Sequence, residues 1–344
     1  IFIFCLGLAV TLLIACVDYR ALVDKIWLPM LIGSVLLLVL TLLFGESGAN
    51  METSNRSWLR IPIIGMMIQP SEFVKFTFIC TFSKHLFSVQ ERINHPLTLL
   101  PLLGHALLII GPILLSGDLG VALIYVGILA LMLFCAGLHP GYFGAAVLLL
   151  LLLAPFLWEH LAEYQQQRII VGFNPELDPL GTGPRYHTVR SLRSLTGGGM
   201  TGQGLFEGTR TQTHNALYAQ HTDYIFSAIG EELGYVGCAL VLVLLALIVI
   251  RCIWVGARSQ DYMRRLVCYG AASALIFQVC VNVGMCMGVM PVIGLTLPLI
   301  SYGGSSTVTI YAMLGLVSGV FARPSPTSYE RYIRPPNYSR FELH

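Results

Sequence analysis

Nine nearly uninterrupted apolar stretches constrain this chain more than any other feature of its sequence. A helix needs about 20 apolar residues to span the hydrocarbon core of a bilayer. Lipid offers the backbone no hydrogen-bond partners, so such stretches are expected to be helical. The sequence therefore predicts an all-α polytopic membrane protein with nine visible spans. They cover residues 1–17, 27–45, 72–88, 97–116, 119–137, 140–157, 224–253, 265–289 and 304–322.

The composition agrees with a membrane protein and argues against other classes. Of the 344 residues, 56% are hydrophobic and 11% are charged, whereas about a quarter of the residues of a soluble domain are charged. The net charge of +2 is too small to indicate a nucleic-acid partner. All nine cysteines fall in apolar stretches without a CxxC pair, so we expect small core or lipid-facing residues.

Lys and Arg in the short connections predict the orientation. They fall on the same side when the spans alternate, and that side should be cytoplasmic. The tail, residues 323–344, lies on this side, and the long loop 158–223 lies outside. We expect one membrane domain over residues 1–344. The basic residues that set this orientation are Arg20, Lys25, Lys84, Arg92, Arg251, Arg258, Arg264, Arg265, Arg323, Arg331, Arg334 and Arg340.

The long outer loop carries its own basic residues and a glycine-rich run. Outward arginines could bind a phosphate-bearing ligand or could be solvated surface residues. The run 196–204 could form an anion-binding nest of N–H groups, and a flexible turn is at least as well supported. The loop arginines are Arg168, Arg185, Arg190, Arg193 and Arg210.

Three carboxylates lie where this loop enters the next apolar stretch. If the chain is helical from Tyr224 onward, Asp223 lies near the N-cap, and Glu231 and Glu232 follow two turns later. Carboxylates at membrane depth are costly unless paired, hydrated or functional. We therefore take Asp223 as the candidate catalytic residue. Glu231 and Glu232 are alternatives as base or cation ligand, although an internal hydrogen-bonded role is favoured.

Two further outer features complete the candidate site. Glu72 and Lys75 are three residues apart on one helix face, so they could form a structural ion pair or bind substrate. Trp58 is either an interfacial anchor or a substrate contact. Residues 290–306 contain two prolines and several glycines among apolar residues, which is typical of a re-entrant, non-helical segment lining a wet cavity.

These motifs together resemble the SEDS (shape, elongation, division and sporulation) family, the RodA/FtsW/SpoVE group. Members have ten transmembrane helices, which implies that the first precedes Ile1 and that the large extracytoplasmic loop joins helices seven and eight. Two motifs depart from the family pattern: Ala219-Gln220 replaces Pro-Glu before His-Thr-Asp, and Arg193-Ser194-Leu195 or nearby residues replace Gln-Ser. The matching motifs are Arg56-Ser57-Trp58, Gln69-Pro70-Ser71-Glu72-Phe73-Val74-Lys75, Gly197 to Gly204, His221 to Phe226 with Gly230 to Gly234, and Pro298 to Ser306.

The resemblance implies a peptidoglycan glycosyltransferase that polymerises lipid II on the outer face of the bacterial cytoplasmic membrane. Its partners would be lipid II, the nascent glycan strand and a class B penicillin-binding protein. It also implies that Asp223 is catalytic and that Trp58 is functionally important. The other expected substrate-binding residues are Lys75, Glu72, Arg210, Ser305 and Ser306.

The chemistry suggests how these residues would act. Asp223 would accept a proton from the acceptor hydroxyl, while positive charge compensates the leaving pyrophosphate. That charge could come from Lys75, from Arg210, from the N–H groups of the glycine run, or from a divalent cation, Mg or Mn. A lipid-linked flippase or other transporter is the alternative function, and a non-catalytic scaffold is a third possibility.

Overall fold

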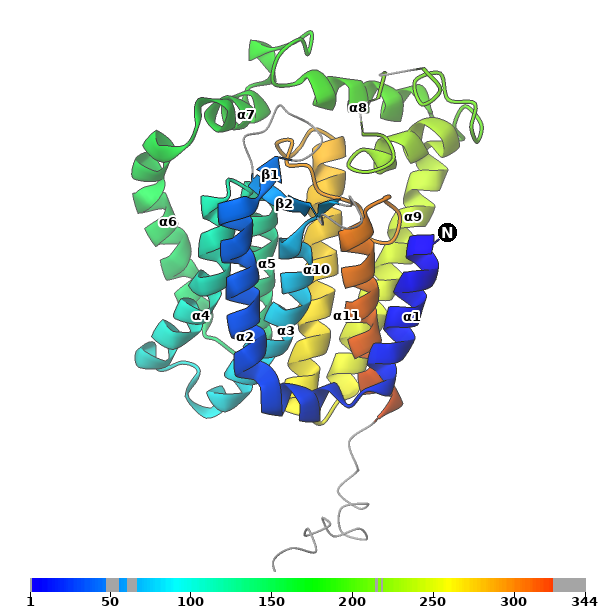
Figure 1. Ribbon diagram of the computed structural model, residues 1–344. Helices are drawn as coiled ribbons and strands as arrows, with labels where there is room; N and C mark the ends of the chain where they lie inside the picture. The colour runs from blue at the N-terminus through cyan, green and yellow to red at the C-terminus, as the bar shows by residue number, and fades with distance from the viewer. Residues whose placement is uncertain (1, 48–55, 61–66, 214–215, 218, 324–344) are drawn as a thin grey trace, which may run out of the picture.

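The computed structural model describes residues 2–47, 56–60, 67–213, 216–217 and 219–323. Each predicted apolar range overlaps one helix, and the helices run alternately up and down in one bundle (Figure 1). The all-α polytopic fold is therefore confirmed. These helices are α1 (Phe2–Cys16), α2 (Tyr19–Phe44), α3 (Pro70–Ser88), α4 (Pro96–Leu115), α5 (Leu119–Cys135), α6 (Pro140–His160), α9 (Ile225–Arg258), α10 (Tyr262–Cys286) and α11 (Gly304–Ala322).

The helices differ in how well they suit a bilayer. By length and composition α2, α4, α9, α10 and α11 can cross a membrane, while α1, α5 and most of α6 are apolar but shorter. Helix α3 is more polar and lies inside the bundle. The count of nine spans stays a prediction, whereas the multi-pass membrane character is established by the five long apolar helices.

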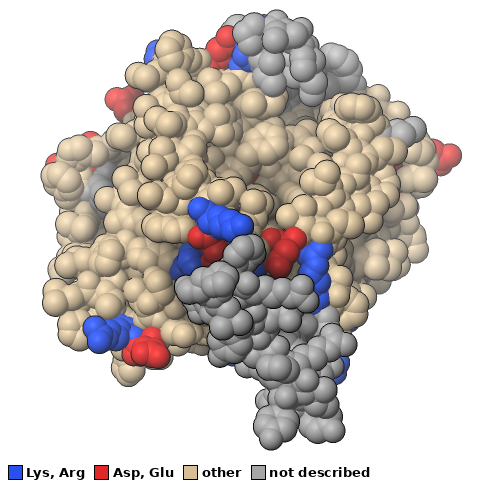
Figure 2. Space-filling view, turned by 60° about the horizontal axis from the view of Figure 1, so that its bottom comes forward, with Lys and Arg blue, Asp and Glu red and all other residues tan. Residues whose placement is uncertain are grey.

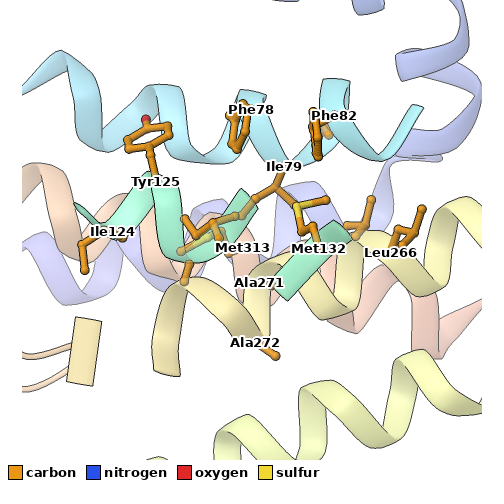
Figure 3. Packing of buried hydrophobic residues seen from close by; sticks show 14 of the residues in the cluster. Phe78, Ile79, Phe82, Ile124, Tyr125, Met132, Leu266, Ala271, Ala272 and Met313 are labelled. Atoms are coloured by element: carbon orange, nitrogen blue, oxygen red, sulfur yellow. The ribbon is translucent and has the colours of Figure 1, made fainter. Parts of the chain in front are cut away.

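Helix α3 is the centre of the packing. Phe78, Ile79 and Phe82 on α3 are buried against Tyr125 and Met132 of α5 and against residues of α10 and α11 (Figure 3). The rings of Phe78 and Phe82 stack with centroids 5.2 Å apart. Surrounded in this way by other helices, α3 can carry polar side chains that a lipid-facing helix could not.

The basic connections lie together at one end of the bundle, which is lowest in Figure 1; we call it the basic end. The alternation predicted from Lys and Arg is thus confirmed, and its cytoplasmic side stays a prediction. Figure 2 shows basic and acidic side chains next to one another on this face. The sequence placed the start of this span at residue 27; α2 begins at Tyr19 but is kinked at Ile26, so the predicted span is the part after the kink, and the part before it carries charged residues that are paired here. The ion pairs are Arg20–Asp261, Lys84–Asp24 and Arg264–Asp18. The predicted cytoplasmic tail lies, beyond Arg323, outside the described residues.

The opposite end, which we call the loop end, carries the remaining connections. The predicted long loop contains two helices, α7 (Glu163–Phe173) and α8 (Tyr186–Gly197), with a 3-10 turn, η2 (Pro175–Leu177), between them. Helix α8 lies across the loop end (Figure 1). Three short antiparallel strands, β1 (Glu46–Ser47), β2 (Arg56–Arg60) and β3 (Met67–Ile68), pair in the order β1-β2-β3.

Helix α9 is interrupted at Gly234, and the glycine-rich run fills the break. Gly234 has φ 67° and ψ −165°, a conformation open essentially only to glycine. The carbonyls of Glu231 and Glu232, which a regular helix would bond to residues 235 and 236, instead accept N–H groups of Gln203 and Gly204 at 3.0 Å each.

The same run completes the other side of the break. The N–H groups of Tyr235 and Val236 donate to the carbonyls of Gly199 and Met200, at 2.9 and 3.2 Å. The run thus satisfies backbone groups that would otherwise be unpaired near the membrane. Its N–H groups at residues 203 and 204 are consequently occupied, which favours a structural role over the predicted anion nest.

Candidate functional site

Asp223 lies at the loop end, at the head of α9. Tyr224 caps the helix, so Asp223 is the last residue of the connector. Its carboxylate makes no hydrogen bond or ion pair with any described residue, and the side chain is partly exposed. Gly294 lies beside this carboxylate, since a Cβ placed on Gly294 would be 3.5 Å from Asp223 Oδ2. The surrounding protein desolvates the carboxylate and raises the pKa of Asp223 to about 6.

The connector before Asp223 is a tight turn. The N–H groups of Thr222 and Tyr224 both donate to the carbonyl of Ala219, at 3.0 and 3.2 Å. Ala219 has φ 50°, an unusual value for a residue other than glycine, asparagine or aspartate. This turn leaves the carbonyls of residues 221–223 bonded outside α9, to α10 and to the segment between α10 and α11.

That segment, residues 287–303, is non-helical, as the sequence predicts. It makes two contacts with the backbone that leads to Asp223. The N–H of Tyr302 donates to the carbonyl of His221 at 2.8 Å, and Ser301 Oγ donates to the carbonyl of Thr222 at 2.5 Å. Asn282 of α10 makes the third contact through Nδ2, which donates to the carbonyl of Asp223 at 2.8 Å. Three consecutive carbonyls are therefore held from α10 and residues 287–303.

Helix α8 borders the same region on its other side. Ser191 is fully buried, where its Oγ bonds the Ser227 hydroxyl at 2.5 Å and the carbonyl of Cys286 at 2.7 Å. The ring of His187 stacks on Tyr224 with centroids 6.1 Å apart. A pocket is lined by Val171 of α7, Thr188 of α8, Gly288 and residues 290–292. The head of α9 is thus enclosed by α8 on one side and residues 287–303 on the other.

The predicted ion pair between Glu72 and Lys75 is confirmed, but it is deep in the bundle. Lys75 Nζ lies 2.8 Å from Glu72 Oε1, and both side chains are buried. Lys75 Nζ also donates to Gln278 Oε1 at 3.4 Å. The charge of Lys75 is therefore already neutralised by Glu72. This arrangement corresponds to the structural ion pair, one of the two roles considered for these residues.

Ser305 and Ser306 are also buried and bonded inside the protein. Ser305 Oγ accepts the N–H of Gln69 at 3.2 Å. Ser306 Oγ accepts from Gln278 Nε2 at 3.1 Å and from the Thr296 hydroxyl at 2.9 Å. The two serines thus connect the start of α11 to the centre of the bundle. Their contact with substrate stays a prediction.

Arg210 and the two glutamates of α9 meet as one anchor for the long loop. The Arg210 N–H donates to Glu231 Oε1 at 2.5 Å, and the Thr211 hydroxyl donates to Glu232 Oε1 at 2.8 Å. Glu232 Oε2 accepts the N–H of Phe206 at 3.1 Å. The glutamates therefore have the internal hydrogen-bonded role that the sequence favours. The Arg210 guanidinium is partly exposed and makes no hydrogen bond or ion pair with another described residue.

Trp58 lies in β2 at the loop end. It pairs in register with Glu46 of β1, and its side chain is partly buried. The N–H of the neighbouring Arg56 donates to the carbonyl of Ser116 at 3.2 Å, which ties the strand to the α4–α5 turn. Trp58 thus lies at the loop end, a position that fits both an interfacial anchor and a substrate contact.

The described residues contain no group of three or more His, Cys, Asp or Glu side chains arranged to hold a metal ion. Asp223 is a lone carboxylate in its surroundings. Mg²⁺ commonly takes one or two protein carboxylates and completes its shell with substrate phosphates and water. The donor set therefore does not form a dedicated metal site, and the divalent cation stays a prediction.

Some polar residues of this region were missed by the sequence analysis. Gln278 is fully buried in α10 and links Lys75, Thr296 and Ser306. Asp118 caps α5 by accepting the Val121 N–H at 3.1 Å. An amide inside an apolar span is a recognisable signal, because such a group needs partners within the bundle. Which partners it finds is not visible in the sequence.

Comparisons with known proteins agree with these motifs and with the fold. The family described as cell cycle protein, which groups FtsW, RodA and SpoVE, matches residues 1–324. A probable peptidoglycan glycosyltransferase FtsW from Geobacter metallireducens is 34% identical over 325 residues, covering 94% of this chain and 84% of the relative. The peptidoglycan glycosyltransferase MrdB of Escherichia coli K12 is 34% identical over 320 residues, covering 92% and 82%.

Solved structures show the same architecture. A chain from a structure described as "Structural coordination of polymerization and crosslinking by a peptidoglycan synthase complex" matches with a TM-score of 0.76 and 31% identity, covering 93% of this chain and 88% of that one. The rod shape determining protein RodA of Thermus thermophilus matches with a TM-score of 0.65 and 28% identity, covering 93% and 85%. On this sequence and structural similarity, the chain belongs to the FtsW/RodA/SpoVE family.

Proposed function

We propose that Asp223 is the general base of a glycosyl transfer that builds glycan strands from lipid II. The chain is a peptidoglycan glycosyltransferase, the activity for which its curated relatives are named. The observation that carries the proposal is the Asp223 carboxylate, which is unpaired among the described residues, partly exposed and desolvated at the loop end. A carboxylate that serves only the fold would be bonded to a neighbour, as Glu72, Glu231 and Glu232 are.

The proposed reaction joins the acceptor sugar to the donor strand with inversion. Asp223 takes the proton of the acceptor 4-hydroxyl as that oxygen attacks the anomeric carbon of the donor. A new carbon–oxygen bond forms, the bond from that carbon to the pyrophosphate oxygen breaks, and its electron pair leaves with the pyrophosphate. A base works best when its pKa lies near the working pH. The raised pKa of Asp223 suits this role.

Arg210 is the best-supported source of positive charge for the leaving pyrophosphate. The buried ion pair occupies Lys75, and the backbone of α9 occupies two N–H groups of the glycine run. Arg210 keeps its guanidinium available within the described region, and Glu231 holds its backbone about 9 Å along α9 from the first helical residue. A guanidinium can form bidentate bonds to phosphate oxygens.

A divalent cation remains part of the proposal. When bound, Mg or Mn would compensate the charge of the pyrophosphate. The cation would arrive with the substrate, since the described residues form no dedicated metal site. Assays with and without chelator test this requirement, and undiminished polymerisation in chelator would remove the cation.

The location and partner follow from the resemblance and from the fold. We propose that the loop end faces outward from the bacterial cytoplasmic membrane, because the basic end carries the Lys and Arg of the short connections. We also propose a class B penicillin-binding protein as partner. The match to a chain of a peptidoglycan synthase complex supports an assembly of this kind.

Replacing Asp223 by Asn tests the central assignment, because Asn keeps the shape and cannot accept the proton. Purified Asp223→Asn should bind lipid II but lose about 10²–10⁴-fold in strand formation, the usual contribution of a general base. Thermal unfolding and lipid II binding, compared with wild type, show that the variant is folded. Polymerisation at the wild-type rate would remove Asp223 from the mechanism. Measuring lipid II translocation in the same vesicles separates this function from the transporter alternative.

A further inference from the structure

We propose that Asn282 and Ser301 are positioning residues, which hold the backbone of residues 221–223 so that the Asp223 carboxylate keeps a fixed direction. This inference rests on the proposed role of Asp223 as the base. Ser301 lies in the Pro298 to Ser306 motif and Asn282 lies outside the motifs named above. The proposal gives both residues a role in the reaction that their sequence and their burial do not define.

The backbone before α9 depends on outside partners. The carbonyl of Tyr224 accepts the N–H groups of Ser227 and Ala228, at 3.0 and 3.1 Å, so regular helical bonding begins there. The carbonyls of residues 221–223 precede it and have no helical partner. Unpaired carbonyls are costly in a buried setting. Within the turn closed on the carbonyl of Ala219, the bonds from Tyr302, Ser301 and Asn282, with a longer contact of 3.7 Å from Cys286 Sγ to the carbonyl of Asp223, therefore fix the direction of these carbonyls.

Asn282 ties three parts of the protein together. Its side chain is fully buried, and both N–H bonds of its amide are used. One donates to the carbonyl of Asp223 at 2.8 Å, and the other donates to the carbonyl of Leu295 at 2.5 Å. A carboxylate has no such donors, and a hydroxyl has only one. The amide thus sets the distance between the head of α9 and residues 287–303.

Ser301 makes the second connection with its hydroxyl. Its Oγ accepts the N–H of Leu297 at 2.7 Å and donates to the carbonyl of Thr222 at 2.5 Å. The Ser301 hydroxyl is therefore a hydrogen-bond donor and an acceptor at the same time. The neighbouring Tyr302 contributes only its backbone N–H to this arrangement, while its ring is 71% exposed.

The carboxylate itself explains why these contacts matter for catalysis. Catalytic groups are commonly oriented by hydrogen bonds to their own side chains. Among the described residues the Asp223 carboxylate makes none, so its direction follows from its backbone and from Gly294 beside Oδ2. A displacement of about 1 Å can cost about 10²-fold in rate. Loosening the backbone at residues 222 and 223 should therefore reduce turnover more than binding.

The test compares four variants with wild type in purified, reconstituted enzyme. Ser301→Ala removes the hydroxyl, Ser301→Thr keeps it, and Asn282→Leu removes both amide donors at similar volume. Ile300→Ala is the matched control, because it truncates an exposed side chain next to Ser301 in the same segment. We measure kcat and KM for lipid II polymerisation, together with the unfolding temperature.

The proposal expects Ser301→Ala and Asn282→Leu to lower kcat by about 10–100-fold with KM changed less than about threefold. Ser301→Thr should recover most of the lost kcat, and Ile300→Ala should keep the wild-type kcat. Folded Ser301→Ala with a wild-type kcat would overturn the proposal. So would Ser301→Thr as slow as Ser301→Ala, or an equal loss in Ile300→Ala. If Asn282→Leu does not fold, the Ser301 pair decides.

Asp223→Asn, assayed in parallel, separates the two claims. An active Asp223→Asn would refute the base assignment, and the positioning role would fall with it. An inactive Asp223→Asn beside a fully active Ser301→Ala would refute only the positioning role. An inactive Asp223→Asn with the kcat losses described above supports both.

Discussion

The kcat/KM of this enzyme for lipid II should fall about tenfold between pH 7 and pH 5, because the proposed base of the free enzyme becomes protonated in that range. Desolvation raises the pKa of Asp223 from an ordinary 3.8 to about 6. A base with that pKa is about 91% ionised at pH 7 and about 9% ionised at pH 5. A carboxylate at its ordinary value would still be about 94% ionised at pH 5.

The assay is the initial rate of strand formation from labelled lipid II at concentrations well below KM, measured with purified enzyme from pH 4.5 to pH 8. The expected kcat/KM profile, which reports the free enzyme, has an acid limb with a midpoint near pH 6. His221 lies two residues before Asp223 and its side chain is exposed, so the His221→Gln variant is the control and should keep the limb. A kcat/KM that stays constant from pH 7 to pH 5 would refute the reasoning.

Protein stability must be followed over the same range. The folded pKa of Asp223 is raised above its unfolded value, so its stabilising contribution is fully present below the unfolded pKa and is lost as the pH rises through about 6. Acidification to pH 5 therefore does not destabilise the fold through this group. A rate loss at an unchanged unfolding temperature consequently reports catalysis.

Three further predictions concern the fold that holds the site. Lys75→Met leaves Glu72 buried without its cation, so it should destabilise by about 3–5 kcal/mol in thermal unfolding; a wild-type unfolding temperature would contradict this. Gly234→Ala places a side chain at φ 67° and should lower the free energy of unfolding by at least about 1–3 kcal/mol. Gly104→Ala, at an open helical position, is the control and should be neutral. Equal unfolding temperatures for these two variants would contradict the backbone strain at Gly234. The Asp178 carboxylate accepts hydrogen bonds from the N–H groups of Thr182, Gly183 and Arg185. Asp178→Asn should therefore speed hydrogen exchange in residues 178–185. Unchanged exchange would exclude a role of Asp178 in ordering this loop.

Asp178 also has a pH dependence with a known sign. Desolvation acts to raise the pKa of Asp178, but the N–H groups of Arg185, Thr182 and Gly183 outweigh it and lower that pKa. A lowered folded pKa means that the stabilising contribution is present above the ordinary value of 3.8 and is lost as the pH falls below it. The protection of these amides, which is their exchange rate relative to the intrinsic rate at the same pH, should therefore be unaffected by pH between 5 and 7.

The apolar pattern was sufficient to predict the helical fold. The span 304–322 matches α11 residue for residue, and each of the others overlaps one helix, because hydropathy is a local property and a bilayer leaves few ways to satisfy the backbone. The placement of Asp223 at the end opposite the basic connections also follows from span alternation. The Glu72–Lys75 ion pair was predictable because residues three apart share a helix face.

Other features depend on contacts between distant parts of the chain. The sequence indicated a flexible or anion-binding glycine run, but the run satisfies the backbone of α9 where Gly234 breaks it. Helices α7 and α8 were missed because their polar residues carry no span signal. Ser305 and Ser306 were expected at the substrate, and the structure bonds them to Gln69, Gln278 and Thr296 inside the bundle.

The sequence by itself determined a helical membrane protein and placed a carboxylate at its loop end. Only the tertiary structure decided that the Asp223 carboxylate is unpaired among the described residues while Glu72, Glu231 and Glu232 are bonded. The physical reason is that a span is set by the transfer of local apolar groups into lipid, whereas the state of a carboxylate depends on donors that folding brings from elsewhere in the chain. For Asp223, those donors bond the backbone carbonyls of the connector, and the carboxylate stays available for the acceptor hydroxyl.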